Sequence, residues 1–313
     1  MRIMVAGATG ALGRRLIPRL VGAGHEVVGM TRTPAKAASL EALGARPVVA
    51  DALDPDAVAR AVADAEPEAV VHQLTALSGG FDLRRFGRTF AETNRLRTVG
   101  TDHLLAAGRA VGVRRFVAQS FAGWPYARTD GAVKSEDDPL DTQPLDEMRE
   151  TVEAIRHLER AVTEATWTTG IVLRYGNFYG PGTSLALDGE TGEMLRRRKF
   201  PIVGDGRGVW SFVHIDDAAE ATALAIERGG AGIYNIVDDD PATVAEWLPE
   251  AARMAGAPAP LRVPRLVGRL VAGAPAVVMM TEARGASNAK AKRELGWQPR
   301  HASWREGMAQ AAA

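Results

Sequence analysis

Short apolar runs alternate with helical patterns through the first half of the chain. The apolar runs, typical of buried strands, lie at 2–6, 26–30, 46–50, 68–73, 113–119 and 169–174. Apolar residues at the spacing of an amphipathic helix follow at 11–22, 34–42, 55–64, 89–111 and 144–165. Strands that alternate with helices predict a parallel sheet with helices on both faces. We therefore expect an α/β fold with a doubly wound parallel sheet of the Rossmann type, and ligands at the carboxyl ends of its strands.

The pattern becomes irregular after residue 174. It predicts further strands at 200–204, 210–215 and 232–237, helices at 188–198 and 216–227, and a mainly helical tail over 243–313. We expect residues 1–174 to form the large domain, with a contribution from 209–237. Residues 175–208 and 238–313 are expected to form a smaller, mainly helical substrate lobe. A cleft between two lobes is a usual place for a small molecule.

Three glycines, spaced three residues apart, separate the first apolar run from the first helical pattern. Gly7, Gly10 and Gly13 allow backbone N–H groups to approach a ligand closely, and the helix that follows directs its positive dipole end to the same place. A dinucleotide pyrophosphate suits such a site. The alternative is a glycine-rich turn that only joins two core elements.

The end of the second strand indicates which dinucleotide is bound. NAD binders usually place a carboxylate there for the ribose hydroxyls, whereas this strand ends at Thr31 and Arg32. The planar guanidinium of Arg32 suits a 2′-phosphate, and Lys36 adds a second positive charge nearby. We therefore predict NADP(H) rather than NAD(H) as the cofactor. The alternative is that Arg32 is an ordinary solvated arginine.

Composition excludes several other functions. The 313 residues include 38 Lys and Arg and 38 Asp and Glu, and this balance does not favour nucleic acid as a partner. The chain has no cysteine, which excludes disulfides and thiolate catalysis. The apolar stretch 270–280 is too short to span a bilayer and contains Pro275. With no leader pattern before the first strand, we expect a cytoplasmic protein that binds neither a membrane nor a metal.

Further motifs follow the glycine turn in a fixed order along the chain. They are Gly7-Ala8-Thr9-Gly10-Ala11-Leu12-Gly13, Asp51, Asn94 within 93–101, Ser120, and the segments 173–182, 211–217 and 294–297. Together they resemble the extended short-chain dehydrogenase/reductases, also called the NAD-dependent epimerase/dehydratase family, over nearly the whole length. The resemblance implies a dinucleotide-binding Rossmann domain and a small-molecule substrate.

The resemblance also implies roles for individual residues. The glycine turn faces the pyrophosphate, 51–53 border the adenine, 74–76 pass the riboses, and 175–178 lie near the nicotinamide. The residues so implied are Gly7, Thr9, Gly10, Ala11, Leu12, Gly13, Asp51, Ala52, Leu53, Leu74, Thr75, Ala76, Asn94, Tyr175, Gly176, Asn177 and Phe178. Asn94 has an equal alternative as a buried amide at a helix kink. For His214 we favour a satisfied, partly buried histidine.

The family's acid/base pair is missing from this chain. The family carries a Tyr followed four residues later by a Lys on the helix after the fifth strand, where the ammonium lowers the pKa of the phenol. None of the four tyrosines (Tyr126, Tyr175, Tyr179 and Tyr234) has a Lys four residues on. Alignment on Leu158-Glu159 places Thr151 at the family's Tyr position and Ile155 at its Lys position. The whole segment 144–165 contains no Tyr and no Lys.

Three explanations for this absence remain open. In the first, Tyr126 supplies the proton, with Lys134 assisting, while Ser120 orients the reacting oxygen; the alternative for Tyr126 is a loop anchor beside Trp124 and Pro125. In the second, a helix residue replaces the pair. The candidates are Glu150, Glu153 and His157. In the third, the protein is a redox-neutral epimerase, isomerase or lyase, or a sensor without catalysis. We predict the first, an NADP(H)-dependent oxidoreductase that acts on a carbonyl or alcohol.

Substrate and assembly are only weakly indicated. The basic run 196–199 suits a diphosphate but is more typical of a solvated helix face. The apolar segment 261–280 suits either a hydrophobic substrate pocket or the core of the small lobe. Family dimers pair the helices that correspond to 89–111 and 144–165, so we expect a homodimer.

Overall fold

A seven-stranded parallel sheet forms the centre of the molecule. The computed structural model describes residues 1–77 and 82–312. The strands run in the order β12-β7-β5-β4-β1-β2-β3, and every neighbouring pair is parallel. They are β1 Arg2–Ala6, β2 Glu26–Thr31, β3 Arg46–Val49, β4 Ala69–His72, β5 Arg115–Phe121, β7 Thr169–Tyr175 and β12 Gly232–Ile236. The predicted Rossmann-type α/β fold is confirmed, and each of the six apolar runs of the first half supplies one strand.

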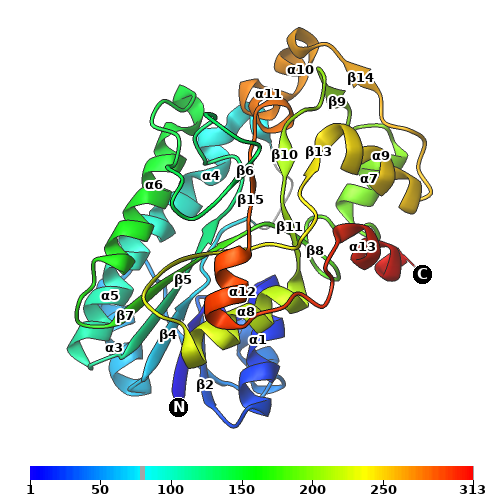
Figure 1. The fold of residues 1–313 in the computed structure, drawn as a ribbon. Coiled ribbons are helices and arrows are strands. Elements are labelled where there is room, and N and C mark those ends of the chain that lie inside the picture. The colour runs from blue at the N-terminus through cyan, green and yellow to red at the C-terminus, as the bar shows by residue number, and fades with distance from the viewer. Residues whose placement is uncertain (78–81, 313) are drawn as a thin grey trace.

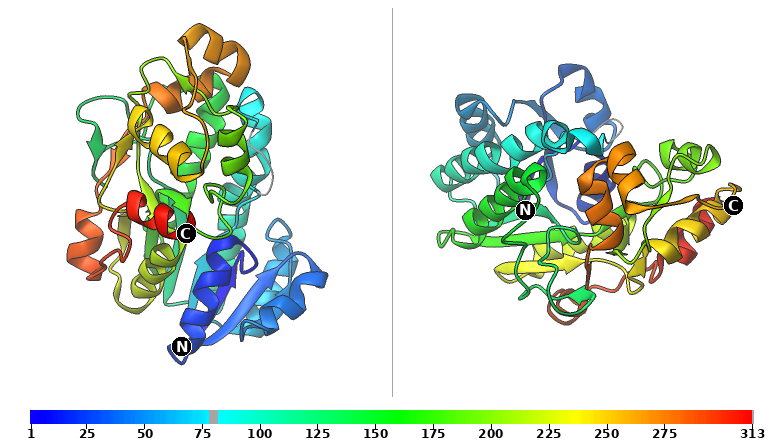
Figure 2. Two further views of the ribbon diagram at one scale, coloured as in Figure 1. Left: turned by 90° about the vertical axis from the view of Figure 1, so that its right-hand side faces the viewer. Right: turned by 90° about the horizontal axis from the view of Figure 1, so that it is seen from above.

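Helices cover both faces of this sheet, as Figures 1 and 2 show. One face packs against α1 (Ala11–Gly22), α2 (Ala37–Glu41), α8 (Ile215–Arg228) and α12 (Ala289–Leu295) in a single apolar cluster. The other packs against α3 (Pro55–Ala65), α5 (Thr101–Ala110) and α6 (Asp146–Thr163). Helix α4 (Phe86–Arg95) lies against α6. Both apolar faces of the sheet are thereby removed from water, which favours the fold.

One predicted helix, 89–111, is divided in the structure. Helix α4 ends at Arg95, one π-helical turn covers Leu96–Gly100, and α5 begins at Thr101. The Thr98 hydroxyl donates to the backbone carbonyl of Asn94 at 3.0 Å. A side chain that bonds the preceding turn in this way perturbs the helical ladder, and single π turns often mark functional sites. Periodicity alone does not reveal this interruption.

The small lobe lies beside the carboxyl ends of the strands, at the upper right of Figure 1. Its core surrounds Trp247 and includes Phe212 and Trp304. Its helices are α7 Glu190–Arg196, α9 Val244–Met254, α10 Arg265–Ala272, α11 Ala274–Thr281 and α13 Trp304–Ala312. Its short strands are β8 Asn177–Tyr179, β9 Ile202–Val203, β10 Val209–Trp210, β11 Phe212–His214, β13 Ala242–Thr243 and β14 Arg262–Val263. Four short elements complete the order: η1 Pro34–Lys36, η2 Leu83–Arg85, β6 Val133–Lys134 and β15 Gly285–Ala286.

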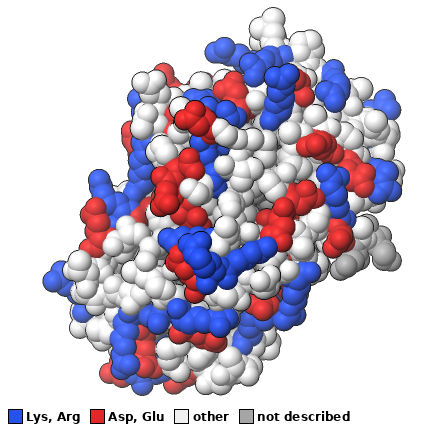
Figure 3. All heavy atoms as spheres, in the orientation of Figure 1, with Lys and Arg blue, Asp and Glu red and all other residues white. Residues whose placement is uncertain are grey.

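The apolar segment 261–280 has two different environments. Met279 and Met280 of α11 are buried in apolar clusters, so this half is core. In α10, by contrast, Leu266 and Leu270 are exposed, and of its residues Gly268 alone is buried. Among the described residues, no helix is both long and apolar enough to cross a bilayer. On the face drawn in Figure 3, positive and negative side chains are interspersed.

Candidate active site

The glycine turn between β1 and α1 is shaped by close backbone packing. Gly7 has φ +91°, and a Cβ there would lie 2.5 Å from the Gln73 carbonyl oxygen at the end of β4. A Cβ on Gly13 would lie 2.4 Å from the Ala8 carbonyl oxygen. Gly10 is exposed and would meet only the Gly7 carbonyl, at 3.2 Å. Two glycines are therefore required by packing, while the third, Gly10, lies exposed at the start of the helix.

The start of α1 is suited to an anion. Its N-cap is Gly10, no side chain in the described part of the chain caps it, and no acidic residue stands in its first turn. Among the described residues, the N–H groups of Ala11, Leu12 and Gly13 therefore have no side-chain acceptor, unlike those at the start of α3, which Asp54 caps. Uncapped N–H groups together with the helix dipole form an anion-binding site. The residues present fit a pyrophosphate at this turn, and Thr9 is half-buried beside it.

At the end of β2, Arg32 meets a carboxylate that the sequence did not predict there. Its guanidinium donates to the Glu92 carboxylate of α4, and both side chains are partly exposed. Lys36 is exposed nearby in the chain. NAD binders usually carry their acid at the strand end, whereas Glu92 comes from a helix sixty residues later. No pattern in α4 distinguishes Glu92 from an ordinary surface glutamate.

The loops after β3 and β4 are held by local hydrogen bonds. The exposed Asp51 accepts from the Leu53 N–H at 3.0 Å, and Ala52 is buried beneath them. Thr93 of α4 accepts from the Ala76 N–H at 3.0 Å, which fixes the segment after β4. Leu74 and Ala76 are half-buried, and Thr75 is exposed.

A buried histidine supports the same segment. Burial lowers the pKa of His72 to about 4, so its ring is neutral at pH 7. Its Nδ1 accepts from the Leu74 N–H at 3.2 Å, and its Nε2 lies 3.0 Å from the Thr101 hydroxyl. That hydroxyl donates to the Arg97 carbonyl, so the proton of the ring resides on Nε2.

The end of β7 is fixed by contacts with its neighbours. The buried Tyr175 hydroxyl lies 2.7 Å from the Thr222 hydroxyl and accepts from Gln73 Nε2 at 3.4 Å. A Cβ on Gly176 would lie 2.8 Å from the Ser211 carbonyl oxygen. The same oxygen accepts from Asn177 Nδ2 at 3.0 Å. Phe178, like Asn177, is half-buried. Because Gln73 also contacts Gly7, the glycine turn and the ends of β4 and β7 meet at one place.

Asn94 lies against Thr151 of α6, the residue that the alignment on Leu158-Glu159 sets at the family's tyrosine position. Its Nδ2 donates to the Thr151 hydroxyl at 3.0 Å, and its backbone carbonyl accepts from Thr98 before the π turn. Thr151 and Ile155 are both buried. This part of α6 therefore offers neither a phenol nor an ammonium group. The contact with α6 and the adjacent π turn agree with the reading of Asn94 as a buried amide at a helix irregularity.

A buried hydrogen-bond network connects three strands with α6. Arg174 of β7 donates through Nε and Nη2 to the two carboxylate oxygens of Glu159, both at 2.7 Å. Ser120 of β5 donates to Glu159 at 2.7 Å. The Tyr126 hydroxyl accepts from Arg174 Nη1 at 3.1 Å and donates to Asn235 Oδ1 at 2.6 Å. We call these five residues the Glu159 network.

The Glu159 network contains both residues predicted to be catalytic. Tyr126 has no exposed surface, and burial raises the pKa of its phenol. Its packing beside Trp124 agrees with the alternative of a loop anchor. Lys134 is also buried, and its ammonium pairs with Asp138 at 3.2 Å. The catalytic roles of Ser120 and Tyr126 stay predictions, and their contacts here are structural ones.

The three α6 residues that could replace the missing pair lie away from the Glu159 network. Glu150, Glu153 and His157 line a cleft of about 430 Å³ beside Asn94 and Arg95. The His157 ring lies 2.8 Å from the Asp102 carboxylate.

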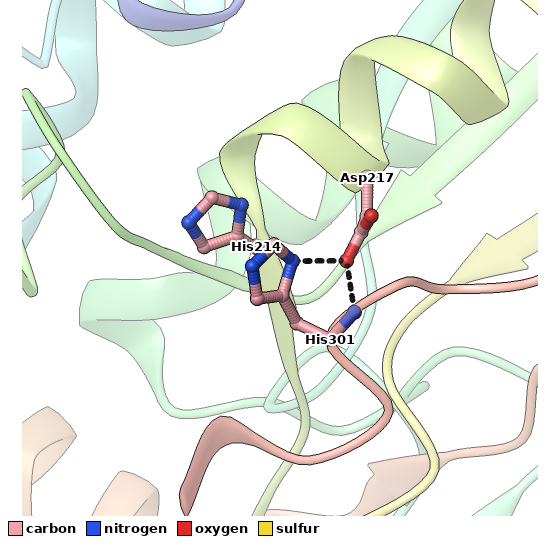
Figure 4. Close-up of side chains that lie close together, drawn as sticks. All are labelled: His214, Asp217 and His301. Atoms are coloured by element: carbon pink, nitrogen blue, oxygen red, sulfur yellow. Dashed lines mark hydrogen bonds and ion pairs between the residues drawn. The ribbon is translucent and has the colours of Figure 1, made fainter. Parts of the chain in front are cut away.

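His214 belongs to a cluster with Asp217 and His301, shown in Figure 4. Asp217 is buried and accepts from the backbone N–H groups of Arg300 and His301 and from the His301 ring. The two imidazoles stack with centroids 3.8 Å apart and an interplanar angle of 28°. Ring lone pairs lie in the ring plane, so stacked rings do not direct them at a common ion. His214 accepts from the Asp216 N–H at 3.3 Å and so caps α8, which agrees with the satisfied histidine that we favoured.

Comparison with known proteins identifies the family. The model of the NAD dependent epimerase/dehydratase family matches residues 3–237. The chain belongs to this family. A 3-diazoavenalumate denitrifying reductase from a Streptomyces species is 45% identical over 98% of this chain and 99% of its own length. A 4-hydroxy-2-methyl-3-oxo-4-farnesyl-3,4-dihydroquinoline-1-oxide ketoreductase from Stigmatella aurantiaca is 28% identical over 79% of this chain and 71% of its own.

A solved structure is similar over the whole chain. MoeE5 in complex with UDP-glucuronic acid and NAD has a TM-score of 0.73 and 26% identity, over 99% of this chain and 97% of that one. Together with the family match, these relatives identify this member of the epimerase/dehydratase family as an NAD(P)-dependent oxidoreductase or epimerase-like enzyme. The resemblance carried by the glycine turn and the later motifs is confirmed.

Proposed function

We propose that this enzyme is a reductase that prefers NADPH and transfers a hydride to a small organic electrophile. The 45% identical relative is named as a reductase and matches almost end to end. When bound, the cofactor supplies the hydride. The uncapped start of α1 at Gly10 would hold the pyrophosphate, and Arg32 would face the 2′-phosphate. Asn177 and Phe178 would border the nicotinamide and the substrate.

The observation that carries the choice of substrate is the pair Thr151 and Ile155. Our alignment sets these two residues where the family carries Tyr and Lys; both are buried, and α6 (Asp146–Thr163) contains no Tyr and no Lys. Reduction of a carbonyl requires a proton for the product oxygen, whereas reduction of an arenediazonium does not. A hydride forms the new C–H bond, and the C–N bond breaks with its electron pair leaving on dinitrogen. The relative's name contains a diazo group, and we propose an aryl diazo compound as a substrate that suits a site without the Tyr/Lys pair.

An isotope experiment tests this reaction. The purified enzyme is incubated with an arenediazonium labelled with ¹⁵N and with NADPH carrying deuterium at C4 of the nicotinamide. We expect labelled dinitrogen, a deuterated arene and oxidised cofactor in equal amounts, well above heat-inactivated enzyme. Tight binding of NADPH without release of dinitrogen above that control would overturn the diazo substrate.

A carbonyl compound is the second candidate, because the 28% identical relative is named as a ketoreductase. This reaction needs the displaced proton donor, and Tyr126→Phe tests it on any ketone that the enzyme reduces. A large fall in kcat would support Tyr126 as the acid, and unchanged turnover would eliminate it. A substrate converted without net cofactor oxidation would instead favour the redox-neutral alternative.

We also propose a homodimer that pairs the α4–α5 and α6 surfaces of two copies. The cleft on this surface carries charges of both signs, from Arg95, Glu150, Glu153 and Arg160. An isologous contact brings the same patch together twice, and opposite charges within that patch allow self-complementary pairs. Light scattering coupled to gel filtration should give twice the chain mass, and a monomer at all concentrations would contradict the proposal.

A further inference from the structure

The ion pair between Arg32 and Glu92 combines two opposing recognition elements. The Arg32 side chain is 59% exposed and that of Glu92 is 45% exposed, so each has surface left for a ligand. A guanidinium favours a phosphate, whereas a carboxylate accepts hydrogen bonds from ribose hydroxyls and repels a phosphate. Arg32 follows β2, the strand whose end faces the adenosine ribose in this fold.

The backbone of Glu92 is fixed at this place. The next residue, Thr93, is fully buried and accepts from the Ala76 N–H at 3.0 Å. Helix α4 is thereby tied to the loop after β4, next to the position that the fold assigns to the cofactor riboses. NAD binders carry a carboxylate at the end of β2, and here the carboxylate at that place, Glu92, comes from α4.

We propose that Glu92 is a specificity-determining residue that weakens NADPH binding and preserves NADH binding. Its carboxylate competes with the 2′-phosphate for Arg32 and accepts a hydrogen bond from the 2′-hydroxyl of NADH. This inference rests on the proposed dinucleotide function. It makes cofactor preference the difference between two opposing residues rather than a property of Arg32 alone.

Calorimetric titration of the intact protein with NADPH and NADH measures this directly. For Glu92→Gln we expect the Kd for NADPH to fall and the Kd for NADH to rise, each by roughly two- to fivefold, the size expected for an exposed ion pair. For Arg32→Gln we expect the Kd for NADPH to rise at least as much and that for NADH to change little. Glu250→Gln is the matched control, because Glu250 pairs with Arg253 on another helix, and it should change neither.

The outcomes separate this inference from the function on which it rests. If wild-type protein binds no dinucleotide, both fail. If it binds NADPH and Glu92→Gln leaves both Kd values unchanged, only the role of Glu92 is overturned. Weaker NADPH binding by Glu92→Gln would also overturn it, because Glu92 would then orient Arg32 toward the phosphate. Thermal unfolding of each variant confirms that the fold is intact.

Discussion

Glu159 is the centre of the buried hydrogen-bond network between β5, β7 and α6. Its carboxylate accepts hydrogen bonds from the Ser120 hydroxyl and from two nitrogens of Arg174, and all three residues are buried. Burial alone would lower the pKa of the Arg174 guanidinium. The hydrogen bonds and the negative charge of Glu159 nevertheless raise this pKa above its usual value. Such a pair is costly to bury but still more costly to break, because a lone charge would remain.

We therefore expect Glu159→Gln to lower the free energy of unfolding by about 3–5 kcal/mol. The amide keeps one oxygen for Ser120 but turns an N–H group toward Arg174. Urea denaturation followed by circular dichroism gives the value. Glu153→Gln, an exposed change on the same helix, should stay within about 0.5 kcal/mol of wild type. Equal effects of the two variants would show that Glu159 is not a structural centre.

At the scale of single elements, the sequence predicted those helices and strands whose apolar positions follow a regular spacing. The seven strands of the central sheet and the helices α1 and α3 lie close to their predicted bounds, whereas the strand predicted at 210–215 is divided into β10 and β11 and that at 200–204 is reduced to β9. The glycine turn was predictable for another reason. Only glycine tolerates the packing at Gly7 and Gly13, so the residue type itself marks the turn. The π turn after α4 was not predictable, because the apolar spacing continues through it and the bond from the Thr98 hydroxyl to the Asn94 carbonyl leaves no mark in that spacing.

The loop that follows β12 provides an element-scale prediction about pH. Asp238 is buried, one of its carboxylate oxygens has no partner among the described residues, and burial raises its pKa to about 9. The folded state therefore holds a proton that the unfolded state has released above about pH 4. Folding stability then decreases as pH rises from about 4 to about 9, by at most about 1.4 kcal/mol per pH unit from this group.

Asp238→Asn removes the titrating carboxyl group, so this proton no longer contributes to the pH dependence of folding. We expect the slope of unfolding free energy against pH, measured by urea denaturation between pH 6 and 9, to be less negative in the variant than in wild type. Asp205→Asn, on an exposed loop of the small lobe, is the control and should keep the wild-type slope. Parallel profiles for Asp238→Asn and wild type would contradict a protonated Asp238.

At the scale of the whole molecule, the unpredicted part of the site consists of contacts between distant segments. Ser120 and Arg174 are register partners on β5 and β7, and Glu159 comes from the helix between those strands. Their contact follows from sheet register and from the position of α6, neither of which a hydrophobic pattern specifies. Glu92 and Arg32 meet for the same kind of reason. The sequence therefore predicts the scaffold, while the electrostatic partners at its ends require the fold.

The C-terminal segment depends on one such long-range contact, the Asp217 carboxylate. It is 1% exposed and accepts from the N–H groups of Arg300 and His301 and from the His301 ring. Hydrogen bonds to a charged group contribute about 1.5–3 kcal/mol each. We expect Asp217→Asn to release the segment around 297–301 from α8, and hydrogen exchange should show faster exchange there than in β1. Asp216→Asn, exposed one residue earlier, should leave that segment protected. Unchanged exchange in Asp217→Asn would show that Trp297 holds this segment without the carboxylate, through its packing and the bond from its Nε1 to the Asp217 backbone carbonyl.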